Sequence, residues 1–204
     1  AYKNVQPGGC VGCYKWVSFN HDSLLSPKDE RPIGNVNPDW VYGFTNRFKF
    51  GHADLSVLVN ISRGNSIINI QRYTYLQLQG TYNEPLTYVQ NSFNPVTNPN
   101  GKYAEINASN GAFPFMNNLM VEDGSYLRLK NVQLGYTIDL PGARYARIYV
   151  SGINLLTSTN YSGYDPEVGA VGNGIGADIN HMPGVDQGSY PAQRIFSFGV
   201  NTSF

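Results

Sequence analysis

Apolar and polar residues alternate along five segments of the chain. In residues 40–50 the even positions carry mostly aromatic side chains, while the odd positions carry small or cationic ones. The same period of two runs through residues 54–62, 128–138, 147–151 and 195–204. A period of two is the geometry of a β-strand. The pattern therefore predicts five strands, at about 40–50, 53–62, 125–139, 144–156 and 192–204.

Parity assigns each side chain of these strands to one of two faces. On the third strand the apolar set is Val132, Leu134, Tyr136 and Ile138. Arg128 and Lys130 share that parity, at one end of the strand only. Alternation thus predicts that these two cations lie on the apolar face.

The connections between the predicted strands are of two kinds. Gly51–Ala53 and Leu140–Ala143 are short and turn-like. The segments 1–39, 63–122 and 157–191 are long, and long structureless loops are uncommon in compact domains. Short turns at one end of the strands and long loops at the other are typical of an outer-membrane barrel.

Composition narrows the class of protein. The chain has 204 residues, 14 Lys or Arg and 14 Asp or Glu, so its net charge is zero and 14% of its residues are charged; roughly 25% is usual in soluble domains. Neutrality without a basic stripe argues against a nucleic-acid partner. The sequence lacks an apolar run of about 18 residues, as a transmembrane helix needs, but a spanning strand needs only about 9–11.

Four sequence runs resemble a known family. They are ERPIGNVNPDWVYGF (30–44), VEDGSYLRLKNVQLGYT (121–137), RIYVSGINLLTSTNYSGYDPEV (147–168) and GSYPAQRIFSFGVNTSF (188–204). In this order they resemble the C-terminal end of SusC/RagA-type TonB-linked outer-membrane proteins. The segment 63–120 is matched least.

The resemblance implies an all-β fold, an antiparallel transmembrane β-barrel segment with long extracellular loops. The chain would supply about the last five strands of a barrel of about 22, whose lumen is plugged. Residues 1–39 would be an extracellular loop or strand end, and 40–204 the C-terminal barrel strands with extracellular loops 63–122 and 157–191. Both short turns and the C-terminus would then be periplasmic, and Arg128 and Lys130 would lie near lipid head groups of the outer leaflet.

The function implied by the resemblance is import across the bacterial outer membrane. Such proteins take up oligosaccharides, or peptides, with a SusD-like surface lipoprotein, and TonB supplies the energy. The expected partners are the rest of the same barrel with its plug, this lipoprotein, TonB and outer-membrane lipid. Two alternatives stay open: a siderophore-type TonB-dependent receptor, and a secreted β-sandwich that serves as a carbohydrate-binding or adhesin module.

Enzyme chemistry is not indicated. The chain has no Gly-x-Ser-x-Gly, His-Glu-x-x-His or phosphate-loop motif. Its histidines, His21, His52 and His181, are far apart in the sequence. We therefore expect neither a catalytic residue nor a cofactor.

Two stretches raise the question of a metal. Family members often carry a calcium-loop-like acidic run where this chain has residues 18–23, but the acid and glycine that calcium would favour are replaced by Ser18 and Ser23. We expect no calcium there. Cys10 and Cys13 lack the further ligands that zinc needs; a local disulfide and two free thiols both remain open.

Aromatic residues of the long loops are the candidates for ligand contact, because aromatic faces pack on sugar rings and on peptide side chains. These are Tyr73, Tyr75, Tyr82, Tyr88, Tyr103, Tyr161 and Tyr164. The alternative is that they pack within the loops themselves or against the lipoprotein. On the strands, Arg47, Lys49, Arg147 and Tyr149 should face the lumen.

The last strand carries the expected assembly signal. Phe196, Phe198 and Phe204 share its apolar face. In barrels of this kind, a final strand with a terminal aromatic is what the insertion machinery is expected to read. Phe204→Ala should therefore lower the amount of protein that reaches the membrane.

Overall fold

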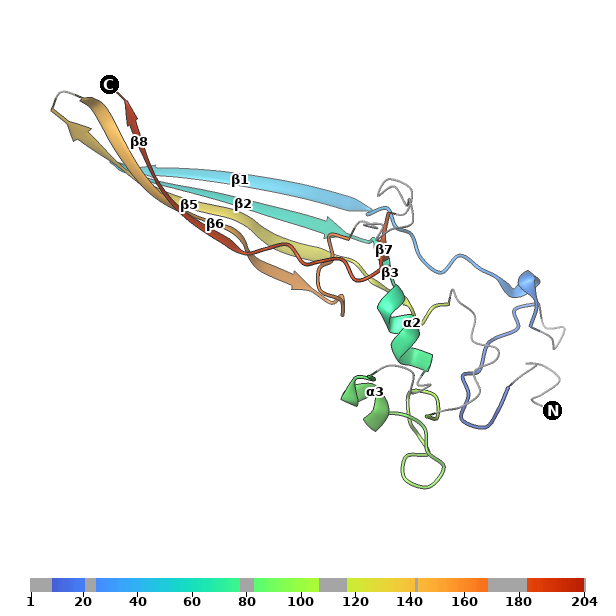
Figure 1. Cartoon of the computed structure of the whole chain (residues 1–204). Coiled ribbons are helices and arrows are strands. Elements are labelled where there is room, and N and C mark those ends of the chain that lie inside the picture. Colours follow the sequence, from blue (N-terminus) through green and yellow to red (C-terminus); the bar gives the residue numbers. More distant parts are fainter. Residues whose placement is uncertain are drawn as a thin grey trace. The chain divides into compact units, whose positions relative to one another are not determined.

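The computed structural model describes residues 9–20, 25–77, 83–106, 117–141, 143–168 and 183–203 (Figure 1). The chain divides into two compact units. Unit 1 consists of Ala1–Ile33 and Ile68–Val121, and unit 2 of Gly34–Ile67 and Glu122–Phe204.

Unit 2 is built on one antiparallel five-stranded sheet. Its strands are β1 (Trp40–Phe50), β2 (Ala53–Arg63), β5 (Tyr126–Leu140), β6 (Ala143–Thr159) and β8 (Ile195–Ser203), and they lie in the order β1-β2-β5-β6-β8. Each strand thus pairs with the next long strand of the chain. The β1–β2 turn, the β5–β6 turn and the end of β8 gather at one end of the sheet (Figure 1).

The register aligns apolar side chains in rows across the sheet. One row, from strand to strand, is Phe48, Leu55, Leu134, Val150 and Phe198. Leu134 is 52% exposed and Phe198 71% exposed. In a soluble domain such an apolar face would be packed against another layer. Here the face is continuous across five strands and open.

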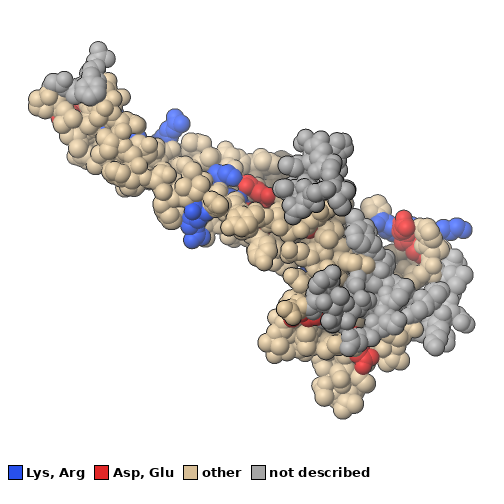
Figure 2. Space-filling view, in the orientation of Figure 1, with Lys and Arg blue, Asp and Glu red and all other residues tan. Residues whose placement is uncertain are grey.

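The opposite face is polar. The adjacent row is Arg47, Ser56, Gln133, Ser151 and Ser197. Formal charges are sparse: in the view of Figure 2 the sheet is mostly uncharged, with Lys, Arg, Asp or Glu visible only at isolated places. The predicted separation of an apolar and a polar face holds along the end of the sheet that carries the turns.

A β-bulge breaks the alternation in β5. The register passes from Leu129 directly to Asn131 with both neighbouring strands, so Lys130 is skipped. The extra residue reverses the parity beyond it. Leu127 and Leu129 thereby join the apolar face, and Arg128 takes the polar one. The prediction that Arg128 lies on the apolar face is wrong.

The segments between the long strands contain short elements. They are η1 (Pro27–Asp29), β3 (Ser66–Asn69), α2 (Ile70–Gln77), α3 (Leu86–Gln90), β4 (Val121–Asp123) and β7 (Val185–Asp186). Strands β4, β3 and β7 form a small sheet in that order. The predicted loop 63–122 therefore has secondary structure of its own. Within the described residues, none of the helices combines the length and apolarity needed to cross a bilayer.

In unit 1 a disulfide closes a tight turn. Cys10 and Cys13 are bonded, and Gly12 between them has a φ of +82°. The Gly12 carbonyl accepts a hydrogen bond of 2.8 Å from the Glu105 backbone N–H. A Cβ at Gly12 would lie 2.7 Å from the Glu105 Cβ. Glycine is required here both for its left-handed backbone and for the close approach of residue 105.

Candidate functional site

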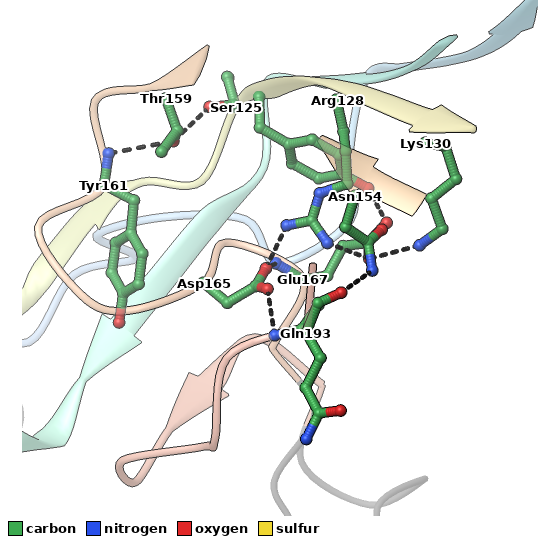
Figure 3. Close-up of polar contacts among 11 residues, drawn as sticks. Ser125, Arg128, Lys130, Asn154, Thr159, Tyr161, Asp165, Glu167 and Gln193 are labelled. Atoms are coloured by element: carbon green, nitrogen blue, oxygen red, sulfur yellow. Dashed lines mark hydrogen bonds and ion pairs between the residues drawn. The ribbon is translucent and has the colours of Figure 1, made fainter. Parts of the chain in front are cut away.

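The most buried charged side chain of the described residues lies on the polar face of β5. Arg128 is 1% exposed. Its Nη1 donates to Glu167 Oε2 at 2.8 Å, and its Nη2 donates to Asp165 Oδ1 (Figure 3). We call Arg128, Asp165 and Glu167 the clasp. Each acid follows β6 in the chain, so the clasp holds the β6–β8 connection onto β5.

Asp165 joins three parts of unit 2. Besides Arg128, its Oδ1 accepts the Glu167 backbone N–H at 2.9 Å, and its Oδ2 accepts the Ala192 N–H at 2.9 Å. Burial opposes ionisation of this carboxyl. The hydrogen bonds from Arg128, Ala192 and Glu167 outweigh that effect and lower the pKa of Asp165. The carboxylate is thus held charged between β5, the 165–167 turn and the residues that lead into β8.

Glu167 stands at the exposed edge of the clasp. Its Oε2 also accepts from Lys130 Nζ at 3.0 Å, and its Oε1 accepts from the Tyr126 hydroxyl at 2.9 Å. The bulge residue Lys130 therefore meets a protein carboxylate.

Further bonds tie the two described ends of the β6–β8 connection together. The Tyr161 hydroxyl donates to Asp186 Oδ2 at 2.5 Å, and Tyr161 is buried. Asn154, whose φ of 54° lies in the left-handed region, donates through Nδ2 to the Gln193 carbonyl at 2.9 Å (Figure 3). Hydrogen bonds therefore hold together the segment that follows β6 and the segment that leads into β8.

A second ion pair lies on the polar face, toward the end that carries the turns. Arg147 on β6 donates to both oxygens of Asp54 on β2, at 2.8 Å from Nε and 2.6 Å from Nη2. The side chain crosses β5 over Gly135, where a Cβ would clash with Arg147 Nη2. Because Gly135 has no side chain, the Arg147 side chain has room to cross β5 and reach Asp54. The Arg147 guanidinium also lies 5.3 Å from the centre of the Tyr149 ring.

The candidate loop tyrosines fall into both units. In unit 1, Tyr88 stacks on Tyr103 with ring centres 4.5 Å apart and lies 6.0 Å from Tyr75. Tyr73 is on α2 and is half-buried. Tyr82 lies outside the described residues. Tyr75, Tyr88 and Tyr103 thus form an aromatic cluster, while a role in binding ligand stays a prediction.

The two candidate tyrosines of unit 2 differ in their exposure to solvent. Tyr161 is 6% exposed and committed to Asp186, which leaves little of its ring for a ligand, whereas Tyr164 is 71% exposed. Of the proposed assembly residues, Phe196 and Phe198 are exposed on the apolar face of β8, and Phe204 lies outside the described residues.

In the described ranges, no three His, Cys, Asp or Glu side chains come together as metal ligands. Near the stretch 18–23, of which residues 21–23 are outside the description, Asp29 accepts the backbone N–H of Phe19 at 2.7 Å and of Ser26 at 2.9 Å. The bond from Ser26 contributes most to lowering the pKa of Asp29. The absence of calcium stays a prediction.

Acid should open the clasp. Because the folded-state pKa of Asp165 lies below its ordinary value of 3.8, its contribution to stability is complete above pH 3.8 and is lost as pH falls through the folded-state pKa. Pepsin digestion of the full-length protein in detergent at decreasing pH should show cleavage in 160–194 rising in this range. Asp165→Asn should be cleaved in this segment already above pH 3.8. The exposed Asp139→Asn should show the same cleavage profile as wild type. A cleavage profile of Asp165→Asn identical to wild type would contradict this assignment.

The chain is similar in sequence to curated TonB-dependent receptors. It is 36% identical to TonB-dependent receptor P3 of Formosa agariphila over 204 residues, which are 97% of this chain and 19% of that protein. It is 30% identical to TonB-dependent receptor P26 of the same organism, over 95% of this chain and 20% of the relative. No family model matches the chain.

Solved structures of one transporter share the fold. The RagAB peptide transporter superposes with a TM-score of 0.71 at 24% identity, over 89% of this chain and 19% of the solved chain. The "closed-closed" RagAB peptide importer gives a TM-score of 0.67 at 23% identity, over 93% and 20%.

The curated relatives confirm the resemblance to TonB-linked outer-membrane proteins, and the RagAB structures confirm the antiparallel β fold. The relatives are receptors and transporters, not enzymes, in agreement with the absence of catalytic motifs in the sequence. The chain spans about a fifth of the length of the relatives it matches.

Proposed function

We propose that this chain, by sequence and fold a segment of a TonB-linked outer-membrane protein of the SusC/RagA type, is the C-terminal part of the barrel wall of an outer-membrane importer. The observation that carries the proposal is the five-stranded meander with one open apolar face and one polar face. In a membrane barrel the apolar face contacts lipid and the polar face lines the interior. Both edges of the sheet, β1 and β8, would then pair with strands outside this chain.

The orientation follows from the ends of the sheet. The turns 51–52 and 141–142 and the end of β8 would be periplasmic, because barrels keep their short connections on that side. The clasp and the connections 63–122 and 157–191 would be extracellular. The clasp would then fix the base of one extracellular connection.

The cargo in this proposal is an oligosaccharide or a peptide, captured with a SusD-like surface lipoprotein and driven by TonB. The resemblance supports both cargo classes, and the RagAB structures are titled peptide transporter and importer. The exposed Tyr164 and the cluster Tyr75, Tyr88 and Tyr103 are the proposed contacts for cargo, since aromatic faces suit either class.

Uptake by cells that carry the full-length protein tests this function. We expect labelled oligosaccharides or peptides to accumulate only when both the receptor and TonB are present. Affinity purification from native membranes should recover a surface lipoprotein with the receptor. Iron-dependent uptake without a lipoprotein would instead favour a siderophore-type receptor. Recovery of the protein as a soluble secreted form would overturn the proposal.

A further inference from the structure

The disulfide turn of unit 1, residues 10–13, depends on its covalent bond for its shape. Within the turn, the Cys13 backbone N–H donates to the Cys10 carbonyl at 3.3 Å, which is long for a bond of this type. Gly12 has a φ of +82°, and a glycine loses more backbone entropy than other residues when its conformation is fixed. The bond between Cys10 and Cys13 is therefore an important constraint on this turn.

The turn packs against the loop 91–105. The Gly12 carbonyl accepts a hydrogen bond of 2.8 Å from the Glu105 N–H, and a Cβ at Gly12 would lie 2.9 Å from Cδ1 of Phe93. The Phe93 N–H donates in turn to the Tyr103 carbonyl at 2.8 Å. The backbone of the disulfide turn thus contacts both ends of one hydrogen-bonded loop.

The same loop carries part of the aromatic cluster. Tyr103 stacks on Tyr88 with ring centres 4.5 Å apart, and Tyr88 lies 6.0 Å from Tyr75. Tyr103 is two residues from Glu105, so the position of its ring depends on the backbone that Gly12 holds. A change in the disulfide turn should therefore reach the cluster.

A small thiol can reach this disulfide. Val11, between the two cysteines, is 81% exposed. Cys10 and Cys13 are themselves half-buried, so they are not sealed in the interior. Exposed disulfides are the ones that exchange with thiolates. The turn thus combines an accessible disulfide with a packing contact that depends on it.

We propose that Cys10 and Cys13 form a thiol–disulfide exchange site, whose reduction by a dithiol releases Gly12 from Glu105 and loosens the aromatic cluster. One thiolate of the dithiol attacks one sulfur of the disulfide, and the other cysteine sulfur leaves as a thiolate. The second sulfur of the dithiol then displaces the first cysteine. The dithiol ends as a disulfide, and its two protons pass to the two cysteines.

The exchange and the release concern unit 1 alone. An effect on cargo rests in addition on the proposed function, in which the aromatic cluster contacts cargo. The experiments below therefore measure the chemistry, the local packing and the uptake separately.

Differential alkylation of the folded full-length receptor in detergent tests the exchange. Dithiothreitol is the probe, and heat-modifiable migration in gels shows that the barrel stays folded. We expect iodoacetamide to label Cys10 and Cys13 after dithiothreitol and not before it. If both cysteines stay unlabelled in the folded, treated receptor, the proposed exchange site is wrong.

Hydrogen exchange followed by mass spectrometry tests the release. With dithiothreitol, the amides of residues 91–106 should exchange roughly tenfold faster, a modest effect because the disulfide closes a short ring. The amides of β5 should keep their rates. Cys10→Ser with Cys13→Ser should show the faster exchange with and without the reagent. Val11→Ser changes the same turn but keeps the disulfide, so this matched control should behave as wild type.

Equal exchange of residues 91–106 in the oxidised and the reduced receptor would contradict the release. Gly12→Ala gives an independent reading, because it keeps the disulfide while its Cβ would lie 2.7 Å from the Glu105 Cβ. Exchange around Glu105 should be faster in this variant even without dithiothreitol. An unchanged rate would show that the turn does not hold Glu105, and the inference would fail.

Uptake by cells keeps this inference apart from the proposed function. At equal surface amount, Cys10→Ser with Cys13→Ser should take up labelled oligosaccharide or peptide more slowly than wild type. Equal uptake by the two proteins would overturn the link between the disulfide and cargo. A wild-type receptor that takes up neither cargo would instead count against the proposed function, and the alkylation and exchange results would still decide the inference.

Discussion

Replacing Arg128 with methionine should lower the free energy of unfolding by about 3–5 kcal/mol, the cost of breaking a buried ion pair from one side. The substitution keeps most of the side-chain volume but removes the donors to Asp165 and Glu167. Asp165 is 7% exposed and would be left as a buried carboxylate without its cation. We expect the loss to appear first as exposure of the β6–β8 connection, since this is the segment that the clasp holds.

Lys130→Met is the matched control. Lys130 contacts the same Glu167, but it is partly exposed, and exposed pairs contribute only about 0–1 kcal/mol. Urea unfolding of the full-length variants in detergent, followed by loss of the heat-modifiable form, compares the two. Arg128→Met with Asp165→Asn should recover part of the stability, because no charge is then left unpaired. Equal stability of the Arg128 and Lys130 variants would refute a special role for the clasp.

The sheet was predictable because its strands obey one rule over long stretches. Residues 40–50 and 195–203 alternate with few exceptions, and the register aligns Phe48 with Leu55 and Val150 with Phe198 as parity requires. Short turns then dictate antiparallel neighbours. Elements without such a period, such as α2 and α3, were missed within the long segment 63–122.

Simple alternation does not predict the clasp, because a bulge in β5 reverses the parity between Leu129 and Asn131. Leu127 and Leu129 are apolar at odd positions, whereas Val132 and Leu134 are apolar at even ones. That change of phase is the signal of an inserted residue, and reading it would have moved Arg128 to the polar face. Its partners lie 37 and 39 residues away along the chain. Such a separation carries no periodic signature, so only the tertiary structure reveals the pairing.

Sequence could not rank the loop tyrosines either. Tyr161 and Tyr164 are three residues apart in the same connection, yet one is buried on Asp186 and the other is open. A tyrosine side chain is equally suited to packing inside a loop and to contacting a ligand. A loop tyrosine packs internally when an acid such as Asp186 lies close enough to accept a hydrogen bond from its hydroxyl. Whether such an acid is near depends on the fold of the whole connection.

The two faces of β8 should respond oppositely to the same charge. Phe198→Arg places a cation on the apolar face, in the row with Leu134 and Val150. On a lipid-facing strand this costs about 2–4 kcal/mol near the bilayer midplane. The full-length variant should reach the outer membrane in reduced amount, and its refolded form in lipid vesicles should unfold at lower urea concentration.

Ser197→Arg is the control that separates the effect of the face on which the arginine lies from the effect of the added charge itself. Ser197 is the preceding residue and lies on the polar face, in the row with Gln133 and Ser151. An arginine there would meet water or interior polar groups, so assembly and stability should stay near wild type. If the two variants were equally impaired, the apolar face would not be the lipid-contacting one, and the strand could not have the orientation on which the proposed barrel depends. If only Phe198→Arg fails, the alternation that first predicted the strand also identifies its environment.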